Sequence, residues 1–190
     1  MKRAARLLWA LVACKSGPDA STNTTTTTST ISSAASAASI GNVKAPFDVT
    51  WTKPTSWTAE PSVGMRKATY RIAKATGDAD DATLSVIVAG GSIDDNVARW
   101  KSQFDNPHDF TRKDDKVGDL GVNIVEIHGT YTGGGMMVGE SPNPKPGWAL
   151  VGAIVQTSPQ PYFFKMLGPD KTIAQARPEF QALVDSIRAK

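Results

Sequence analysis

Apolar and polar residues are distributed unevenly along this chain. Large apolar side chains are concentrated in residues 46–190, whereas residues 15–45 hold few of them. Within residues 21–39, thirteen of the nineteen positions are Ser or Thr. Such a stretch buries too little apolar surface to offset the entropy that it would lose on folding. We therefore predict a globular domain over residues 46–190 and a disordered Ser/Thr/Ala-rich linker over residues 14–45.

Alternation of apolar and polar positions predicts most of the strands in the domain. The polar stretch Gly77–Asp81 separates two of these segments, which indicates a hairpin. Residues 148–156 are apolar or small on both alternating faces, so we expect this strand to be central and covered on both sides. The predicted strands cover residues 47–51, 65–73, 82–89, 122–131, 148–156 and 162–167.

A helix is predicted after the break at Gly90-Gly91. Ser92 followed three residues later by Asp95 resembles a capping box and serves as the helix start rather than as an anion site. Apolar residues then recur with helical spacing. They are Ile93, Val97, Trp100 and Phe104. We expect the helix to end at Asn106-Pro107.

A second helix is predicted near the C-terminus. Its apolar stripe consists of Phe180, Leu183, Val184 and Ile187. Pro178 is expected near its start, because the first turn tolerates proline. Strands joined by short turns imply an antiparallel sheet, and two amphipathic helices must bury their apolar stripes against it. The predicted fold class is therefore α+β, with two helices packed on an antiparallel sheet.

Charge argues against nucleic acid as a partner. Three of the 21 Lys and Arg residues, Lys2, Arg3 and Arg6, lie in the first thirteen residues. Without them, 18 basic residues face 18 acidic ones. Because nucleic-acid binders present a basic face to phosphates, and no Lys/Arg run occurs here, we expect no nucleic-acid binding.

The N-terminus carries the most specific motif. The apolar run Ala4–Ala13 is far shorter than the roughly 20 residues that cross a membrane, and it has the size of a signal-peptide core. It ends in Leu11-Val12-Ala13-Cys14, which resembles the lipobox of bacterial lipoproteins. This resemblance implies a signal peptide over residues 1–13 and lipidation of Cys14, the only cysteine. The alternative is an ordinary secretory signal that is cleaved later and removes Cys14.

The lipobox resemblance also implies a location. Its acyl chains would make the lipid membrane a partner through Cys14, since two or more chains anchor stably. Lys15 is not the aspartate that this class associates with retention in the inner membrane. We therefore expect a cell-envelope protein, at the outer membrane if the host has one.

The C-terminal half has a second resemblance. The two-sided strand 148–156, the segment Tyr162–Pro169 and a helix with Phe180 and Ser186-Ile187 resemble uncharacterised bacterial lipoproteins with a sandwich similar to PsbP-like domains. PsbP proteins act as non-catalytic extrinsic subunits of the photosynthetic oxygen-evolving complex. Nothing in this sequence suggests photosynthesis, so only the architecture is carried over.

Glu126 and His128 form the best polar pair. Residues two apart on a strand point to the same face, where a carboxylate and an imidazole could bind a metal or act as acid and base. A third group would be required, from His108 or a nearby aspartate; the aspartates considered are Asp109, Asp114 and Asp115. The simpler interpretation places both residues on the solvated side of an edge strand, with Val125 and Ile127 facing the core.

A long loop, Gly133–Gly147, offers another surface. It contains Met136 and Met137, and adjacent methionines adapt to varied apolar partners. The simpler interpretation is a long hairpin loop without a role. No catalytic motif or cofactor pattern is recognised, so we expect no cofactor and no metal site. The leading hypothesis is a tethered, non-catalytic module that binds an envelope protein or a ligand; the rival is a metal-binding or hydrolytic domain using Glu126 and His128.

Overall fold

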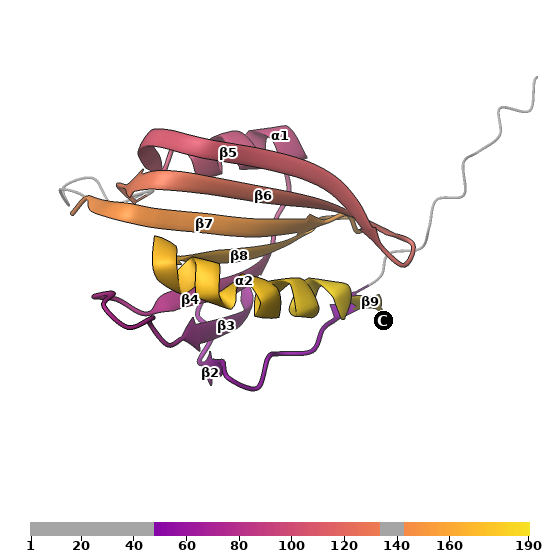
Figure 1. Cartoon of the computed structure of the whole chain (residues 1–190). Helices are drawn as coiled ribbons and strands as arrows, with labels where there is room; N and C mark the ends of the chain where they lie inside the picture. The colour runs from indigo at the N-terminus through magenta and orange to yellow at the C-terminus, as the bar shows by residue number, and fades with distance from the viewer. Residues whose placement is uncertain (1–47, 134–142) are drawn as a thin grey trace, which may run out of the picture. The chain divides into compact units, whose positions relative to one another are not determined.

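A computed structural model describes residues 48–133 and 143–190, which form two β-sheets and two α-helices (Figure 1). The strands are β1 (Val49–Thr50), β2 (Thr58–Glu60), β3 (Arg66–Ile72), β4 (Ala82–Val88), β5 (Phe104–Val117), β6 (Leu120–Tyr131), β7 (Lys145–Val155), β8 (Tyr162–Pro169) and β9 (Arg188–Ala189). The helices are α1 (Ile93–Lys101) and α2 (Asp170–Asp185). The larger sheet has the order β2-β3-β4-β8-β7-β6-β5, and every neighbouring pair is antiparallel. The predicted α+β class is confirmed.

Helix α2 covers one face of the large sheet, which we call the α2 face (Figure 1). Its sixteen residues bury one apolar stripe against the central strands. The stripe consists of Ile173, Ala176, Phe180, Leu183 and Val184, and it packs with strand residues that include Leu84, Val86, Val151, Phe164 and Met166. The stripe and the strand residues that it packs against form the larger of the two hydrophobic cores.

Helix α1 covers part of the opposite face, which we call the α1 face. Trp100 packs against β7 at Gly152, where a Cβ atom would come within 2.2 Å of the indole ring. Only glycine permits this approach, so the position of α1 depends on that residue. The smaller core comprises Val97, Trp100, Phe104, Val125, Ile127, Leu150, Ile154 and Phe163. Strand β7 therefore contributes to both cores, as its sequence predicted.

The predicted extent of the first helix is wrong. Helix α1 ends at Lys101, and Phe104, although buried, begins the strand β5. Asn106-Pro107 lies inside that strand, where the pairing with β6 is irregular on both sides of His108. Because β5 is an edge strand with most side chains exposed, it lacks the apolar alternation that marks a half-buried strand. An edge strand also tolerates proline.

The predicted start of the second helix is also wrong. Helix α2 begins at Asp170, so Pro178 lies in its interior. Proline there removes the hydrogen bond to the carbonyl of Ala174, four residues earlier. Both Ala174 and Pro178 are exposed, so water can reach this carbonyl.

Several segment ends differ from the expectation. Strand β7 begins at Lys145, which makes Gly147 part of the strand rather than of the long loop. The first predicted strand is reduced to β1, which pairs with β9 near the C-terminus and not with the large sheet. The short strands β2 and β9 were not predicted.

Neither helix of the described residues has the length and apolar character needed to cross a membrane.

Candidate functional site

Glu126 and His128 lie on β6, between β5 and β7. The interpretation that β6 is an edge strand is therefore wrong, because the polar residues 104–117 form a further strand outside it. Val125 and Ile127 are fully buried on the α1 face. Glu126 and His128 point to the α2 face and are half-buried.

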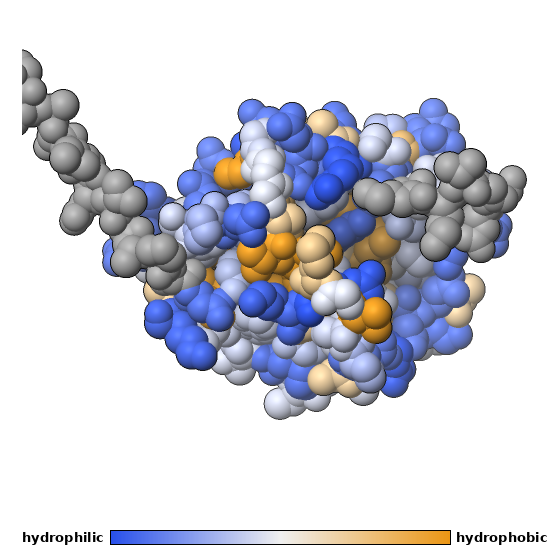
Figure 2. Space-filling view, turned by 180° about the vertical axis from the view of Figure 1, so that it is seen from behind, coloured by the Kyte–Doolittle hydropathy of each residue, from blue (hydrophilic) through white to orange (hydrophobic). Residues whose placement is uncertain are grey.

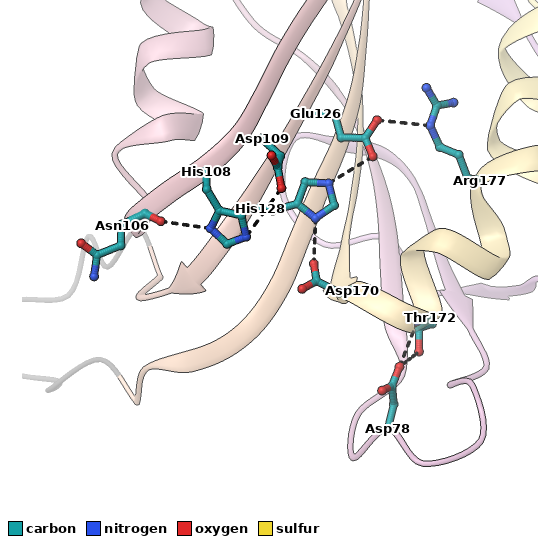
Figure 3. A network of polar contacts seen from close by, with 9 residues as sticks. All are labelled: Asp78, Asn106, His108, Asp109, Glu126, His128, Asp170, Thr172 and Arg177. Atoms are coloured by element: carbon teal, nitrogen blue, oxygen red, sulfur yellow. Dashed lines mark hydrogen bonds and ion pairs between the residues drawn. The ribbon is translucent and has the colours of Figure 1, made fainter.

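A chain of polar contacts links this pair to α2 (Figure 3). With its ring protonated on both nitrogens, His128 donates from Nδ1 to Oδ1 of Asp170 (2.9 Å) and from Nε2 to Oε1 of Glu126 (3.2 Å). The other oxygen of Glu126, Oε2, lies 3.6 Å from Nε of Arg177. Asp170 and Arg177 both belong to α2, so the chain joins strand β6 to two turns of the helix.

Small residues let the start of α2 approach the sheet beside His128. On the α2 face, His128 pairs with Ala149, which in turn pairs with Gly168. A Cβ atom at Gly168 would lie 2.4 Å from the Cβ of Ala82 on β4. Apart from the two histidines His108 and His128, this row has no large side chain. We infer that its small residues allow Asp170 to come within reach of His128.

The contacts favour the charged form of His128. Partial burial lowers the pKa of the imidazole, but hydrogen bonds to Asp170 and then Glu126, together with their negative charges, outweigh it. The pKa of His128 is therefore raised above its ordinary value of 6.5. The result is an imidazolium held between two carboxylates.

This arrangement suits a structural link better than a reaction centre. A metal-binding imidazole must offer one nitrogen lone pair, and a general base must offer the same to its substrate. Here both nitrogens of His128 bond to carboxylates. Within residues 48–133 and 143–190, no three His, Cys, Asp or Glu side chains are grouped in a way that could hold a metal ion.

The other candidate groups do not join this chain. His108 is the cross-strand partner of His128, with ring centroids 6.2 Å apart, but its Nδ1 lies 3.3 Å from the carbonyl oxygen of Asn106. Asp109 lies near His108, with Oδ2 4.0 Å from its Nε2. The remaining aspartates have their own partners: Asp114 accepts from Asn123 and Asp115 pairs with Lys113. Cys14, Met136 and Met137 lie outside the described residues.

The cap of α1 agrees with the sequence-based interpretation. The Oγ atom of Ser92 accepts a hydrogen bond from the backbone N–H of Asp95 (3.0 Å). The hydroxyl in turn donates to Oδ2 of Asp95 (2.6 Å). Ser92 thus caps the helix through its contacts with Asp95, three residues later in the chain.

The cap of α2 could not be read from nearby residues. Pro169 precedes the helix and offers no side-chain cap. Instead, Oδ2 of Asp78, in the β3–β4 loop, accepts from the backbone N–H (2.9 Å) and the hydroxyl (2.6 Å) of Thr172 (Figure 3). The Thr172 hydroxyl accepts from the N–H of Ala75 (2.9 Å). A carboxylate 94 residues away in sequence therefore satisfies a free N–H at the helix start.

One cavity lies where the segment before β2 meets α2. It has a volume of about 330 Å³ and includes Trp57, Thr172 and Glu179 in its wall. Glu179 accepts hydrogen bonds from the indole N–H of Trp57 (2.8 Å) and the hydroxyl of Ser56 (2.6 Å). Both carboxylate oxygens of Glu179 are thus occupied by neighbouring donors, which ties this segment to the helix.

Comparisons with known proteins find similar solved structures but no family. No protein-family model matches the chain, and no curated protein matches it. A solved structure of cyanobacterial PsbP (CyanoP) from Synechocystis is similar, with 13% identity, a TM-score of 0.46, and coverage of 79% of this chain and 96% of that chain. A protein of unknown function from Pseudomonas aeruginosa is similar at 10% identity and a TM-score of 0.45, over 73% of this chain and 94% of that chain. These similarities concern the fold alone.

Proposed function

We propose that the chain is a membrane-anchored lipoprotein of the cell envelope and that its α+β domain is a non-catalytic binding module. The lipobox-like segment Leu11–Cys14 supports the anchor. The proposal of a non-catalytic module is carried by the hydrogen bonds of both His128 nitrogens to carboxylates. His128, which belongs to the best catalytic candidate pair in the sequence, therefore serves as a link between β6 and α2.

Labelling with radioactive palmitate in the bacterial host tests the anchor. The wild-type chain is expected to incorporate label and to fractionate with membranes, whereas Cys14→Ser is expected to lose both. Ala13→Asp, which spoils the small residue before the cysteine but keeps the thiol, serves as the matched control and is expected to block lipidation as well. Equal label in wild type and Cys14→Ser would refute the lipoprotein assignment.

The rival function, a metal-binding or hydrolytic domain, is tested through the same polar chain. His128→Gln and Glu126→Gln are each expected to lower the free energy of unfolding, because each leaves a half-buried partner with a lost contact. Metal analysis of the purified wild-type chain is expected to show no stoichiometric metal. One equivalent of bound metal that disappears in both variants would establish the rival.

A further inference from the structure

The α1 face is only partly covered. Helix α1 has nine residues and packs on the sheet through Val97 and Trp100, the latter against Gly152 of β7. The neighbouring strands β8 and β4 continue this face beyond the helix. Seen from this side, apolar residues gather at the centre and polar residues frame them (Figure 2). A sheet face that is open beside a helix has room for a ligand.

The strand register fixes which side chains form the floor of this open area. Lys165 on β8 pairs with Ser85 on β4, and two residues along the strands Phe163 pairs with Ile87. Ile87 also pairs with Arg66 on β3. Because directly paired residues share a face, Lys165, Ser85 and Ile87 all lie on the α1 face, and Lys165 and Ile87 are diagonal neighbours about 7–8 Å apart. The Lys165 amine itself extends toward the helix side, where it lies 5.9 Å from the centroid of the Tyr131 ring.

Side chains from two other segments flank this open area on opposite sides. On the helix side, Gln103 follows α1, and its Oε1 accepts a hydrogen bond from Nζ of Lys165. On the other side, the segment between β2 and β3 carries Val63 and Met65, whose side chains are 75% and 78% exposed. A hollow of about 360 Å³ is lined by Val63, Met65, Arg66 and Ile87. Its volume lies at the lower end of the range for small-molecule sites, about 300–1,000 Å³.

Two of the three cations around this area have neutral hydrogen-bond partners. Lys165 donates to the amide of Gln103, and Arg99 of α1 donates to the amide of Asn96. Within residues 48–133 and 143–190, no ion pair to a carboxylate is formed by Lys165, Arg99 or Arg66. By contrast, Arg71 on the same strand as Arg66 pairs with two carboxylates, Glu60 and Asp81, each at 3.1 Å.

Two further observations favour an anionic ligand in this area. Burial first, and then the nearby charges of Arg99 and Arg66, lower the pKa of Lys165 to about 8. Thr69 pairs with Ser85 in the same cross-strand row as Lys165. Thr69 is 6% exposed, and its hydroxyl has no hydrogen-bond partner among the described residues. An anion would neutralise the cations, and charge-assisted hydrogen bonds to it would be stronger than those to the present amides.

We propose that this open area of the α1 face binds a single-chain anionic amphiphile, a long-chain carboxylate, as a monomer. Its head group lies between Lys165, Arg66 and Arg99, and its alkyl chain lies on Ile87 and Met65. One compact group of cations next to an apolar hollow matches one charged head with one apolar tail. This inference rests on the proposed binding function and names its ligand class.

Calorimetric titration tests the ligand class. The full chain carrying Cys14→Ser is used, so that no acyl group on the protein competes, and dodecanoate is added below its micelle concentration. We expect saturable one-to-one binding, with at least tenfold weaker binding of dodecanol, which has the same chain and no charge. Acetate, which has the charge and no chain, is expected not to bind. Equal affinity for dodecanoate and dodecanol, or no binding of dodecanoate, would overturn the proposal.

Substitutions locate the site. Arg66→Gln combined with Lys165→Met is expected to weaken dodecanoate binding at least tenfold while leaving dodecanol unaffected. Arg188→Gln removes a cation from the far end of the chain, in β9, and is expected to change nothing. Thermal melts establish that the variants fold. Unchanged dodecanoate affinity in the folded double variant would overturn the proposal, as would binding only to vesicles of anionic phospholipid.

The outcomes for the anchor and for this site are separate. Loss of palmitate label without loss of dodecanoate binding would leave the site in place on a protein that is not acylated. Retained label with no binding of dodecanoate would leave the anchor and remove the site.

Discussion

The two faces of the large sheet differ in how completely they are built. On the α2 face, a sixteen-residue helix buries a continuous apolar stripe, and its charged residues Asp170 and Arg177 have partners on β6. On the α1 face, a nine-residue helix covers part of the sheet, and Arg66 and Lys165 have no carboxylate partner among the described residues. The α2 face thus carries the longer helix and the larger core, whereas the α1 face is only partly covered and carries cations without a carboxylate partner among the described residues.

This difference suggests that the α2 face contributes mainly to folding stability and the α1 face to binding. Interactions that are complete within the chain contribute to folding stability, because every polar group already has a partner. Groups left exposed or unbalanced contribute little to stability and remain available to a ligand. The polar pair most conspicuous in the sequence, Glu126 and His128, belongs to the first kind. The proposed binding residues belong to the second.

The largest expected difference concerns apolar truncation on the two faces. Phe180 of α2 is fully buried against the sheet, so Phe180→Ala is expected to lower the free energy of unfolding by about 3–5 kcal/mol. Ile87 lies in the open area and is half-buried, so Ile87→Ala is expected to cost well under half of that. Urea denaturation followed by circular dichroism measures both. Equal losses would show that the α1 face is as closed as the α2 face.

The next effect tests how α1 is placed. Gly152→Ala puts a methyl group where the rigid indole ring of Trp100 lies, and overpacking of this kind costs about 1–3 kcal/mol. We expect the double variant Gly152→Ala, Trp100→Leu to recover part of the loss, because the smaller side chain makes room. Denaturation curves of the single and double variants provide the measurement. Full stability of Gly152→Ala would mean that α1 does not rest on this glycine.

A third effect tests the long-range cap of α2. Asp78→Ala removes the acceptor for the N–H and the hydroxyl of Thr172, and loss of a cap costs about 1–2 kcal/mol. Asp119, an exposed aspartate in the turn between β5 and β6, provides the control. Asp119→Ala is expected to change the stability by less than about 0.5 kcal/mol. Indistinguishable midpoints for the two variants would argue against the cap.

The smallest effects are opposite pH dependences from the two faces. The pKa of His128 is raised in the fold, so its contribution to stability is complete below about 6.5 and is lost as pH rises through the folded value. The pKa of Lys165 is lowered to about 8 from 10.5, so between these values the unfolded chain binds the extra proton and stability rises with pH.

Variants separate these two contributions. His128→Gln is expected to flatten the decline of stability above pH 6.5, and Lys165→Met is expected to flatten the rise between pH 8 and 10.5. Both are followed by denaturation midpoints across pH. A wild-type slope that survives in the matching variant would assign it to another group.

The sequence predicted those elements whose signal is an apolar pattern on both faces of a strand or a contact between residues close in the chain. Residues 148–156 predicted the central strand β7 because both of its faces are apolar, and Ser92 predicted a helix start because its partner Asp95 is three residues away. Strand β5 was missed because an exposed edge strand needs no apolar alternation. Its absence from the prediction left β6 at the edge and placed Glu126 and His128 in solvent.

The site depends on contacts that sequence spacing does not encode. Asp170 lies 42 residues from His128, and Asp78 lies 94 residues from Thr172. Only the order of strands in the sheet brings these groups together. The unbalanced charge of Lys165 is likewise invisible in the sequence, because residues 14–190 hold 18 basic and 18 acidic residues and the pairing of each cation depends on the register.

The most direct test of this account is to map dodecanoate binding by NMR. Amide shifts of the full chain carrying Cys14→Ser are recorded during the titration. We predict changes concentrated on β4, β8 and the end of α1, around Ile87, Lys165 and Gln103, with Glu126 and His128 unchanged. Changes centred on Glu126, His128 and Asp170, with the α1 face silent, would contradict the assignment of stability to one face and binding to the other.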